Sequence, residues 1–261
     1  MTLWMRFDAD GETLFGTLEG DAVTAWSGDM FADPRPTGRR FPLAEVRPRT
    51  PCVPAKLIGL WNNFHERAAK EGLARPAHPL YFLKAPSCHA AHGEPIRRPP
   101  AYDGAVVFEA ELGIVIGRRA SALGVAEAPA AIFGYTCVND VTARDLMRLD
   151  PAFTHWTRAK SFDSFGVIGP AIARGIDPGG LRVRALVDGE ERQNYPVADM
   201  FFSPAEIVSL ISHDMTLEPG DVIACGTSVG AGPLAAGETV EVAIDGIGRL
   251  VNRFGGQAPA A

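Results

Sequence analysis

Short apolar segments separated by glycine and proline run along most of this chain, and this pattern restricts it to a fold rich in β-strands. The 261 residues include 28 glycines and 21 prolines, which interrupt helices and favour turns. Because strands do not alternate regularly with helices, we expect a β-rich α+β fold and not a doubly wound sheet. The apolar runs with the length and composition of strands lie at 57–60, 81–83, 106–116, 131–138, 181–187, 222–225 and 240–244.

Two segments carry signals of helices. The sequence Ser203-Pro-Ala-Glu206 is a capping box with proline at the first helical position, and it predicts a helix over 206–212. A second helix is expected over 141–149, because Asn139 and Asp140 directly before it are residues that cap helices.

Residues 1–50 are expected to form a small N-terminal β subdomain. Strands at 3–7, 13–18 and 22–26 are separated by Asp10-Gly11 and Gly20-Asp21, which are typical hairpin turns. The stretches 33–40 and 48–51, rich in proline and arginine, are expected to form a linker or crossover. A larger domain over 51–256 and a short tail over 257–261 complete the predicted organisation.

Composition excludes several classes of protein. Lys and Arg number 25 against 31 Asp and Glu, giving a net charge of −6, so no nucleic-acid or membrane partner is expected. No apolar run approaches the ~18 residues of a membrane span, and no export signal opens the chain; we therefore expect a cytoplasmic protein. The scattered cysteines argue against disulfides and zinc and are expected to be buried thiols; they are Cys52, Cys88, Cys137 and Cys225.

The run 106–117 contains Glu109 and Glu111 inside an otherwise apolar strand. Strand side chains alternate between faces, so the two carboxylates point to one side, within ~7 Å of each other. Such a pair raises its own pKa unless a cation holds it. The alternative is an edge strand whose exposed face carries two solvated acids.

A third carboxylate follows at Asp140, where the strand 131–138 gives way to the predicted helix. Three oxygen donors suit Mg²⁺ or Mn²⁺, and no nearby histidine pair favours zinc or iron. Arg144 stands one helical turn later. The alternative assigns Asp140 to a helix cap with an ion pair to Arg144.

Several separate motifs resemble those of the fumarylacetoacetate hydrolase family, and together they cover about residues 52–254. The resemblance implies a mixed β-sandwich roll, a homodimer, and Mg²⁺ or Mn²⁺ held by Glu109, Glu111 and Asp140. It also implies that Lys160 is an active-site lysine, and that His65 is a general base. The motifs are Glu109-Ala-Glu111, 139–145, Arg158-Ala-Lys160-Ser-Phe-Asp163, 220–228 and 244–252.

Further residues are expected to bind substrate. The family pattern places Arg144 and the turn Gly226-Thr227 at the site, and the turn's N–H groups and hydroxyls, including Ser228, suit an anion. Lys84 ends an apolar strand, and either binds a substrate carboxylate or is a surface charge. Residues 61–72 and Phe201-Phe202 are expected to shape the choice of substrate.

Three features of the sequence qualify these assignments. Many family members carry Glu three residues after the histidine and Gln seven residues after the metal-binding Asp, whereas this chain has Ala68 and Met147. His65 therefore lacks its usual carboxylate, and a purely structural role is the alternative. The sequence 226–230 also matches the nucleophile elbow of serine hydrolases, but the following glycines and proline preclude the required helix, and no histidine follows His213.

The predicted chemistry is enolate formation from a 2-keto (β-diketo) acid, with a divalent metal stabilising the negative charge. The first prediction is hydrolytic C–C cleavage of an acylpyruvate, and the family resemblance implies a place in aromatic-compound catabolism. Decarboxylation of an oxaloacetate-like acid and isomerisation of a 2-hydroxyhepta-2,4-dienedioate-like acid are alternatives on the same site. A non-catalytic keto-acid binder is the alternative outside enzymes.

Overall fold

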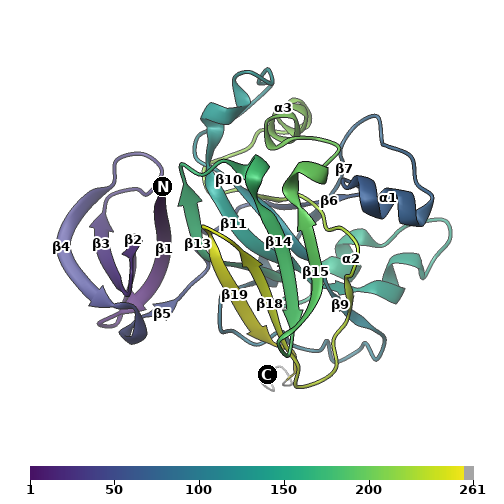
Figure 1. Cartoon of the computed structure of the whole chain (residues 1–261), viewed down its shortest axis with the longest axis horizontal. Coiled ribbons are helices and arrows are strands. Elements are labelled where there is room, and N and C mark those ends of the chain that lie inside the picture. The colour runs from purple at the N-terminus through teal and green to yellow at the C-terminus, as the bar shows by residue number, and fades with distance from the viewer. Residues whose placement is uncertain (256–261) are drawn as a thin grey trace.

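The computed structural model describes residues 1–255, whose strands form three sheets (Figure 1). This confirms the predicted β-rich α+β fold. The largest sheet has twelve strands. Its order is β4 (Arg35–Pro42), β3 (Ala22–Ser27), β2 (Glu12–Glu19), β1 (Thr2–Ala9), β13 (Gly166–Arg174), β11 (Ile132–Asp140), β10 (Ala110–Ile116), β16 (Val222–Ala224), β6 (Leu57–Trp61) and β7 (Leu80–Lys84), with β5 (Arg47–Pro48) beside β1 and β8 (His89–Ala90) beside β13.

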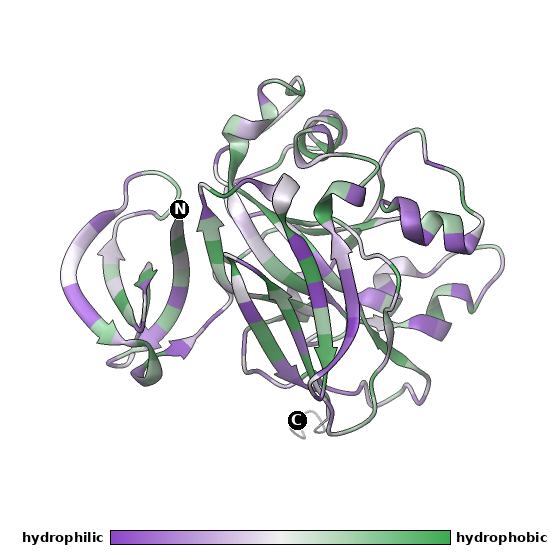
Figure 2. Ribbon diagram, in the orientation of Figure 1, coloured by the Kyte–Doolittle hydropathy of each residue, from purple (hydrophilic) through white to green (hydrophobic). Residues whose placement is uncertain are grey.

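A second sheet packs on the middle of the first and makes the molecule a sandwich. Its strands contact β10, β11 and β13, and Figure 1 shows them in front of these strands. Figure 2 shows hydrophobic residues in the strands of both sheets, and their buried side chains belong to one core cluster. The second sheet has the order β15 (Glu190–Pro196), β14 (Arg182–Val187), β18 (Thr239–Ile244), β19 (Gly248–Arg253), and a third contains β12 (Thr142–Ala143), β9 (Val106–Phe108) and β17 (Gly232–Pro233).

Helices are few and short. The predicted capping box is confirmed: Ser203 Oγ accepts from Glu206 N at 3.3 Å, and Glu206 Oε2 accepts from Ser203 N at 2.8 Å. Within residues 1–255, no helix has the length and apolar character required to cross a membrane. The α-helices are α1 (His65–Glu71), α2 (Trp156–Lys160) and α3 (Pro204–Asp214), and the 3₁₀ turns are η1 (Leu43–Glu45), η2 (Pro86–Cys88), η3 (Ala128–Ala131), η4 (Arg144–Arg148), η5 (Pro178–Gly180) and η6 (Val197–Asp199).

The N-terminal strands have a small core of their own, which includes Met5, Phe7 and Val23. Both predicted hairpin turns are present, and β1 pairs with β13, which joins this part to the main sheet. The prediction of a linker at 33–40 was wrong, because 35–42 form the edge strand β4. An outermost strand tolerates proline, since the backbone groups on its outer side face solvent. The predicted tail 257–261 lies outside the described residues.

Two further predictions need correction near the carboxylates. The run 106–117 is not one strand, because β9 and β10 separate at Glu109, whose N–H bonds to the Asn139 side chain instead of a ladder carbonyl. The segment 141–149 is not an α-helix: it forms β12 and then the 3₁₀ turn η4. Strand β9 pairs with Thr142 and Ala143. The backbone N–H and C=O groups there bond to a neighbouring strand and are not available for the hydrogen bonds of an α-helix.

The four cysteines are buried free thiols, as predicted. Burial raises the pKa of Cys52 to about 12 and that of Cys88 to about 11. These thiols are therefore protonated at neutral pH and chemically inert.

Candidate active site

The three predicted carboxylates converge at the point where β9, β10 and β11 meet. Glu109 lies between β9 and β10, Glu111 is the second residue of β10, and Asp140 ends β11. Pairing of Ala110 with Asn139 aligns the strands, and Asp140 N donates to Glu109 O at 2.9 Å. One oxygen from each carboxylate lies within 4.8 Å of the others.

Two lysines bind this carboxylate cluster from below the surface. Lys160 at the end of α2 donates to Glu109 Oε2 and to Asp140 Oδ2, the latter at 2.5 Å. Lys84 at the end of β7 donates to Asp140 Oδ1 and to the carbonyls of Val141 and Phe165. Both lysines are 3% exposed, so their charges are held inside the protein by the carboxylates.

Burial and neighbouring charges shift the protonation of these groups in opposite directions. Burial, together with the charges of Asp140 and Glu109, raises the pKa of Glu111 well above its ordinary value. Burial acts in the same direction on Asp140, but Lys160 and Lys84 outweigh it and lower the pKa of Asp140. Burial opposes the charge on Lys160, yet the surrounding carboxylates hold the pKa of Lys160 above its ordinary value. Glu111 is thus the member of the cluster that lacks a cation of its own.

The donor set fits a hard divalent cation. All three candidate ligands are carboxylates, which Mg²⁺ and Mn²⁺ prefer, and three negative charges exceed the two positive charges of Lys84 and Lys160. Glu111 is 1% exposed and Asp140 is fully buried. Such buried negative charge requires compensation, and a divalent cation would supply it.

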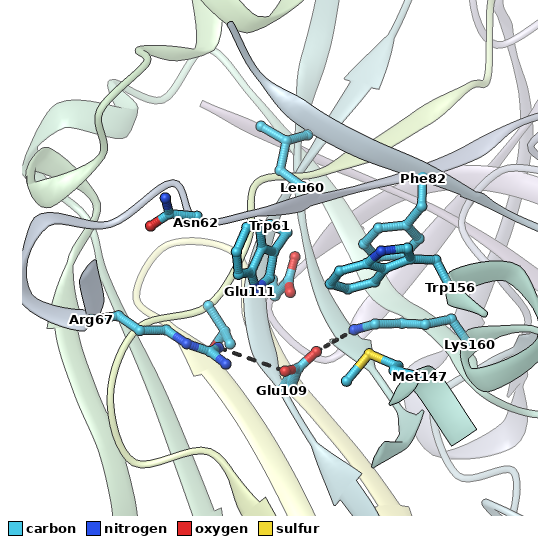
Figure 3. Close-up of a pocket in the computed structure, with 11 residues that line it drawn as sticks. Leu60, Trp61, Asn62, Arg67, Phe82, Glu109, Glu111, Met147, Trp156 and Lys160 are labelled. Carbon is cyan, nitrogen blue, oxygen red and sulfur yellow. Dashed lines mark hydrogen bonds and ion pairs between the residues drawn. The ribbon is translucent and has the colours of Figure 1, made fainter. Parts of the chain in front are cut away.

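A narrow cavity opens onto Glu109, Glu111 and Lys160 (Figure 3). Aromatic rings enclose one side of it: the centroids of Trp61 and Trp156 are 5.8 Å apart, and Phe82 stacks on Trp156 at 5.3 Å. The Lys160 ammonium lies 4.9 Å from the centre of the Phe82 ring. The residues lining the cavity are Leu60, Trp61, Asn62, Arg67, Phe82, Glu109, Glu111, Met147, Trp156, Lys160 and Thr227.

Sequence analysis did not identify Arg67, Phe82, Trp156 or Gln193 as site residues. Trp61 and Arg67 do lie in the segment 61–72 that was expected to shape the choice of substrate. Gln193 in β15 accepts from Ala110 N at 3.1 Å and donates to Thr227 Oγ1 at 2.9 Å, which ties the carboxylate strand to the glycine-rich turn. No local pattern distinguishes this buried glutamine from its charged neighbours in 190–194.

The glycine-rich turn lies beside the carboxylates, but it is already partly used. Gly226 N donates to Glu111 Oε2 at 2.8 Å, so this N–H orients a candidate ligand and is not directed to substrate. Thr227 lines the cavity. Ser228 is buried, and its hydroxyl has no hydrogen-bond partner within residues 1–255.

Two predicted substrate-binding residues lie elsewhere than expected. Lys84 is neither a surface charge nor directed into the cavity, because its ammonium contacts Asp140 and two carbonyls. Arg144 is exposed at the start of η4, and no ion pair joins it to Asp140 in the described part of the chain. The expected pairing one helical turn apart is missing because this segment is not an α-helix.

His65 is the first residue of α1 and is exposed. Its ring packs on Phe201 with the centroids 4.2 Å apart, and it does not line the cavity. Position 68, where many family members have Glu, is a buried alanine facing the body of the protein. The structure therefore does not bring His65 together with the carboxylates.

Two known family models match this chain. The family model described as fumarylacetoacetate (FAA) hydrolase, C-terminal, matches residues 56–255, and one described as Rv2993c-like, N-terminal, matches residues 3–47. The chain is 34% identical over 229 residues to oxaloacetate tautomerase YisK from Bacillus subtilis (strain 168), covering 82% of this chain and 75% of that protein.

Two solved structures share the whole architecture. The crystal structure of 2-hydroxyhepta-2,4-diene-1,7-dioate isomerase from Mycobacterium marinum has a TM-score of 0.89 and 36% identity, covering 97% of this chain and 98% of that one. Maleylpyruvate hydrolase from Sphingobium sp. SYK-6, in complex with manganese (II) ion and pyruvate, has a TM-score of 0.82 and 25% identity, covering 98% of this chain and all of that one.

Proposed function

This chain belongs to the fumarylacetoacetate hydrolase family, and on that premise we propose that it is a divalent-metal-dependent enzyme that forms the enolate of a small 2-oxo acid. One observation carries the proposal: Glu109, Glu111 and Asp140 offer oxygens within 4.8 Å of one another, beside the buried ammonium of Lys160. In a solved relative, maleylpyruvate hydrolase, manganese and pyruvate are bound together.

Each residue has a defined part in this proposal. Glu109, Glu111 and Asp140 would hold Mg²⁺ or Mn²⁺, which when bound supplies Lewis-acid stabilisation of charge on the 2-oxo oxygen. Lys160 adds a second positive charge at the cavity wall, where a low-dielectric setting strengthens its effect on a developing anion. Lys84 acts through Asp140 as a positioning residue, because its donors face Asp140 and backbone carbonyls.

The walls of the cavity limit the shape of the substrate. Trp61, Phe82 and Trp156 enclose one side, and Thr227 offers a hydroxyl on another. Arg144, exposed beyond the cavity, is proposed to attract anionic substrate toward the site and not to contact the reacting atoms.

The enolate can form by loss of a proton from C3 or by cleavage of the C3–C4 bond. Hydrolytic cleavage requires a base that activates water, and His65 is exposed against Phe201. The geometry therefore supports keto–enol interconversion better than the hydrolysis of an acylpyruvate. Hydrolysis is the second candidate, because His65 belongs to α1, the helix that also carries the cavity-lining Arg67.

Exchange of C3 protons tests the proposal directly. Purified enzyme is incubated with pyruvate in D₂O with Mg²⁺ or Mn²⁺, and loss of the methyl signal is followed by NMR. We expect chelation by EDTA to abolish exchange, and Glu111→Gln to reduce it by about 10³-fold. Glu190→Gln, at an exposed position of β15, is the matched control. Equal exchange rates with and without EDTA would exclude the proposal.

The hydrolytic candidate is tested with an acylpyruvate. If His65 activates water, His65→Ala lowers hydrolysis by about 10²–10⁴-fold and lowers C3 exchange much less. A wild-type enzyme that exchanges C3 protons but releases no carboxylic acid from acylpyruvates would exclude hydrolysis. The homodimer expected from the family remains a prediction for measurement of molar mass in solution.

A further inference from the structure

Arg67 brings a positive charge from α1 to the open side of the carboxylate cluster. Its side chain is 22% exposed, and Nη1 lies 3.6 Å from Glu109 Oε1. Nε donates to Glu71 Oε1 at 2.9 Å, one turn further along the helix. Figure 3 shows the guanidinium pointing from α1 toward Glu109, while Lys160 approaches Glu109 from the opposite side.

Among the described residues, Nη1 at the tip of this guanidinium has only the 3.6 Å ion pair with Glu109. Within residues 1–255, the hydrogen bond of Arg67 to another side chain uses Nε, and none uses Nη1 or Nη2. A guanidinium presents paired N–H donors that match a carboxylate in a bidentate arrangement. Arg67 also lines the cavity, so a ligand there can reach these donors.

The charges of the carboxylate cluster match one carboxylate of a ligand bound at a divalent cation. Glu109, Glu111 and Asp140 carry three negative charges, and Lys84 and Lys160 carry two positive ones. A bound divalent cation would change the sum from −1 to +1, which the carboxylate of a 2-oxo acid balances. Arg67, on the other side of Glu109, also pairs with Glu71 at 2.9 Å, so a second carboxylate would be held there by the paired N–H donors of the guanidinium and not by an uncompensated charge.

The cavity favours a short acid. The rings of Trp61, Phe82 and Trp156 restrict one side of it, and Arg67 Nη1 lies only 3.6 Å from Glu109 Oε1. Few carbon atoms therefore fit between the carboxylate cluster and Arg67.

We propose that Arg67 binds the second carboxylate of a short 2-oxo dicarboxylate and thereby directs the reaction to proton transfer at C3. This inference rests on the proposed function and names its substrate class. In proton transfer, the C3–H bond breaks and its proton passes to water, its electron pair forms the C2–C3 double bond, and the 2-oxo oxygen takes the charge and then a proton from water. In the competing reaction the C3–C4 bond breaks, carbon dioxide leaves, and C3 takes a proton.

The two reactions make opposite demands on the second carboxylate. Loss of carbon dioxide requires this group to give up its negative charge, and an ion pair with a guanidinium stabilises the charged state. Proton transfer at C3 leaves the carboxylate charged throughout. Arg67 is thus a specificity-determining residue both for the substrate and for the outcome.

The test compares oxaloacetate with pyruvate, which differ by one carboxylate. Wild type, Arg67→Met, Arg67→Lys and the control Lys70→Met, an exposed position on the same helix, are assayed with Mg²⁺. Keto–enol interconversion of oxaloacetate, C3 exchange of pyruvate and release of carbon dioxide are measured, each corrected for the uncatalysed rate. Oxalate has two directly joined carboxylates and no group in the position of the C4 carboxylate of oxaloacetate. Its inhibition constant therefore reports binding at the carboxylate cluster alone.

We expect Arg67→Met to lower kcat/KM for oxaloacetate relative to that for pyruvate at least tenfold, mainly through KM. The fraction of oxaloacetate that loses carbon dioxide should rise, Arg67→Lys should restore part of the preference, and the inhibition constant of oxalate should change less than the KM of oxaloacetate. Lys70→Met should resemble wild type.

An equal loss of kcat/KM for both substrates in Arg67→Met would mean that Arg67 only supports Glu109. This result would overturn the inference, while the proposed function would stand. An unchanged preference and an unchanged carbon dioxide fraction would also overturn it. If wild type exchanges no C3 protons of pyruvate and Glu111→Gln changes nothing, the proposed function itself fails.

Discussion

Two aspartates are buried in this protein beside lysines, yet their surroundings differ. Asp221, directly before β16, is fully buried and accepts from Lys56 N at 2.9 Å and from Glu218 N at 2.8 Å, and Lys56 Nζ lies 2.6 Å away. Asp140 at the end of β11 is equally buried, but its oxygens accept from two ammonium groups and stand beside two further carboxylates.

The difference separates a structural charge from a functional one. The backbone N–H groups of Glu218 and Lys56 satisfy Asp221, so its charge holds the turn before β16 against the residue that precedes β6. Asp140 instead belongs to a cluster whose negative charges repel one another and raise the pKa of Glu111. A protein keeps such an arrangement at a cost in stability, and this is typical of a site that binds a cation or reacts.

The largest expected effect concerns Asp140. Asp140→Asn should reduce C3 exchange by about 10³-fold, because several kcal/mol of stabilisation of the developing charge depend on the cation site. Its free energy of unfolding should also fall, because the fully buried Lys84 loses its carboxylate partner, so the loss of exchange is what distinguishes this variant from Asp221→Asn. NMR exchange rates and urea unfolding measure the two quantities. If the two variants lost the same activity, the distinction between the aspartates would fail.

Asp221→Asn should act on stability. Removing the charge leaves Lys56 without its buried partner and places an amide donor against backbone donors, at a cost of about 3–5 kcal/mol. Turnover below the unfolding transition should stay close to wild type. Urea denaturation followed by circular dichroism measures the change, and an unaltered midpoint would contradict the structural role.

A smaller effect is expected at Lys56, whose side chain is 24% exposed. In Lys56→Met, both oxygens of Asp221 keep their backbone donors, so the loss of one charged hydrogen bond should cost about 1.5–3 kcal/mol. The same unfolding measurement compares it with Asp221→Asn. A loss as large as that of the aspartate variant would show that the lysine, and not the backbone, satisfies Asp221.

The smallest effect is expected on the N-terminal strands. Arg39 on β4 pairs with Glu12 and Asp10 at 2.9 and 3.3 Å, but all three side chains are exposed. Solvent screens such pairs, so Arg39→Gln should leave the urea midpoint unchanged within error. A clear shift would mean that exposed charges hold β4 in place and that burial is a poor guide to their role.

Much of the site follows from local rules. The two-residue period of a strand places Glu109 and Glu111 on one side, and hairpin turns and the Ser203 capping box follow from short-range hydrogen bonding. Residues 33–40 and 141–149 were misread for a common reason. Their local preferences point to a linker and a helix, but pairing with β3 and with β9 gives their backbone groups other partners.

The sequence by itself thus determined the strand-rich class, the turns, and the acidic residues able to bind a cation, because each depends on neighbours along the chain. The tertiary structure alone decided that Lys84 turns to Asp140, that Arg67 reaches Glu109 from α1, and that His65 stays outside the cavity. These contacts join segments far apart in sequence, and burial sets the strength of their charges, so no local pattern encodes them.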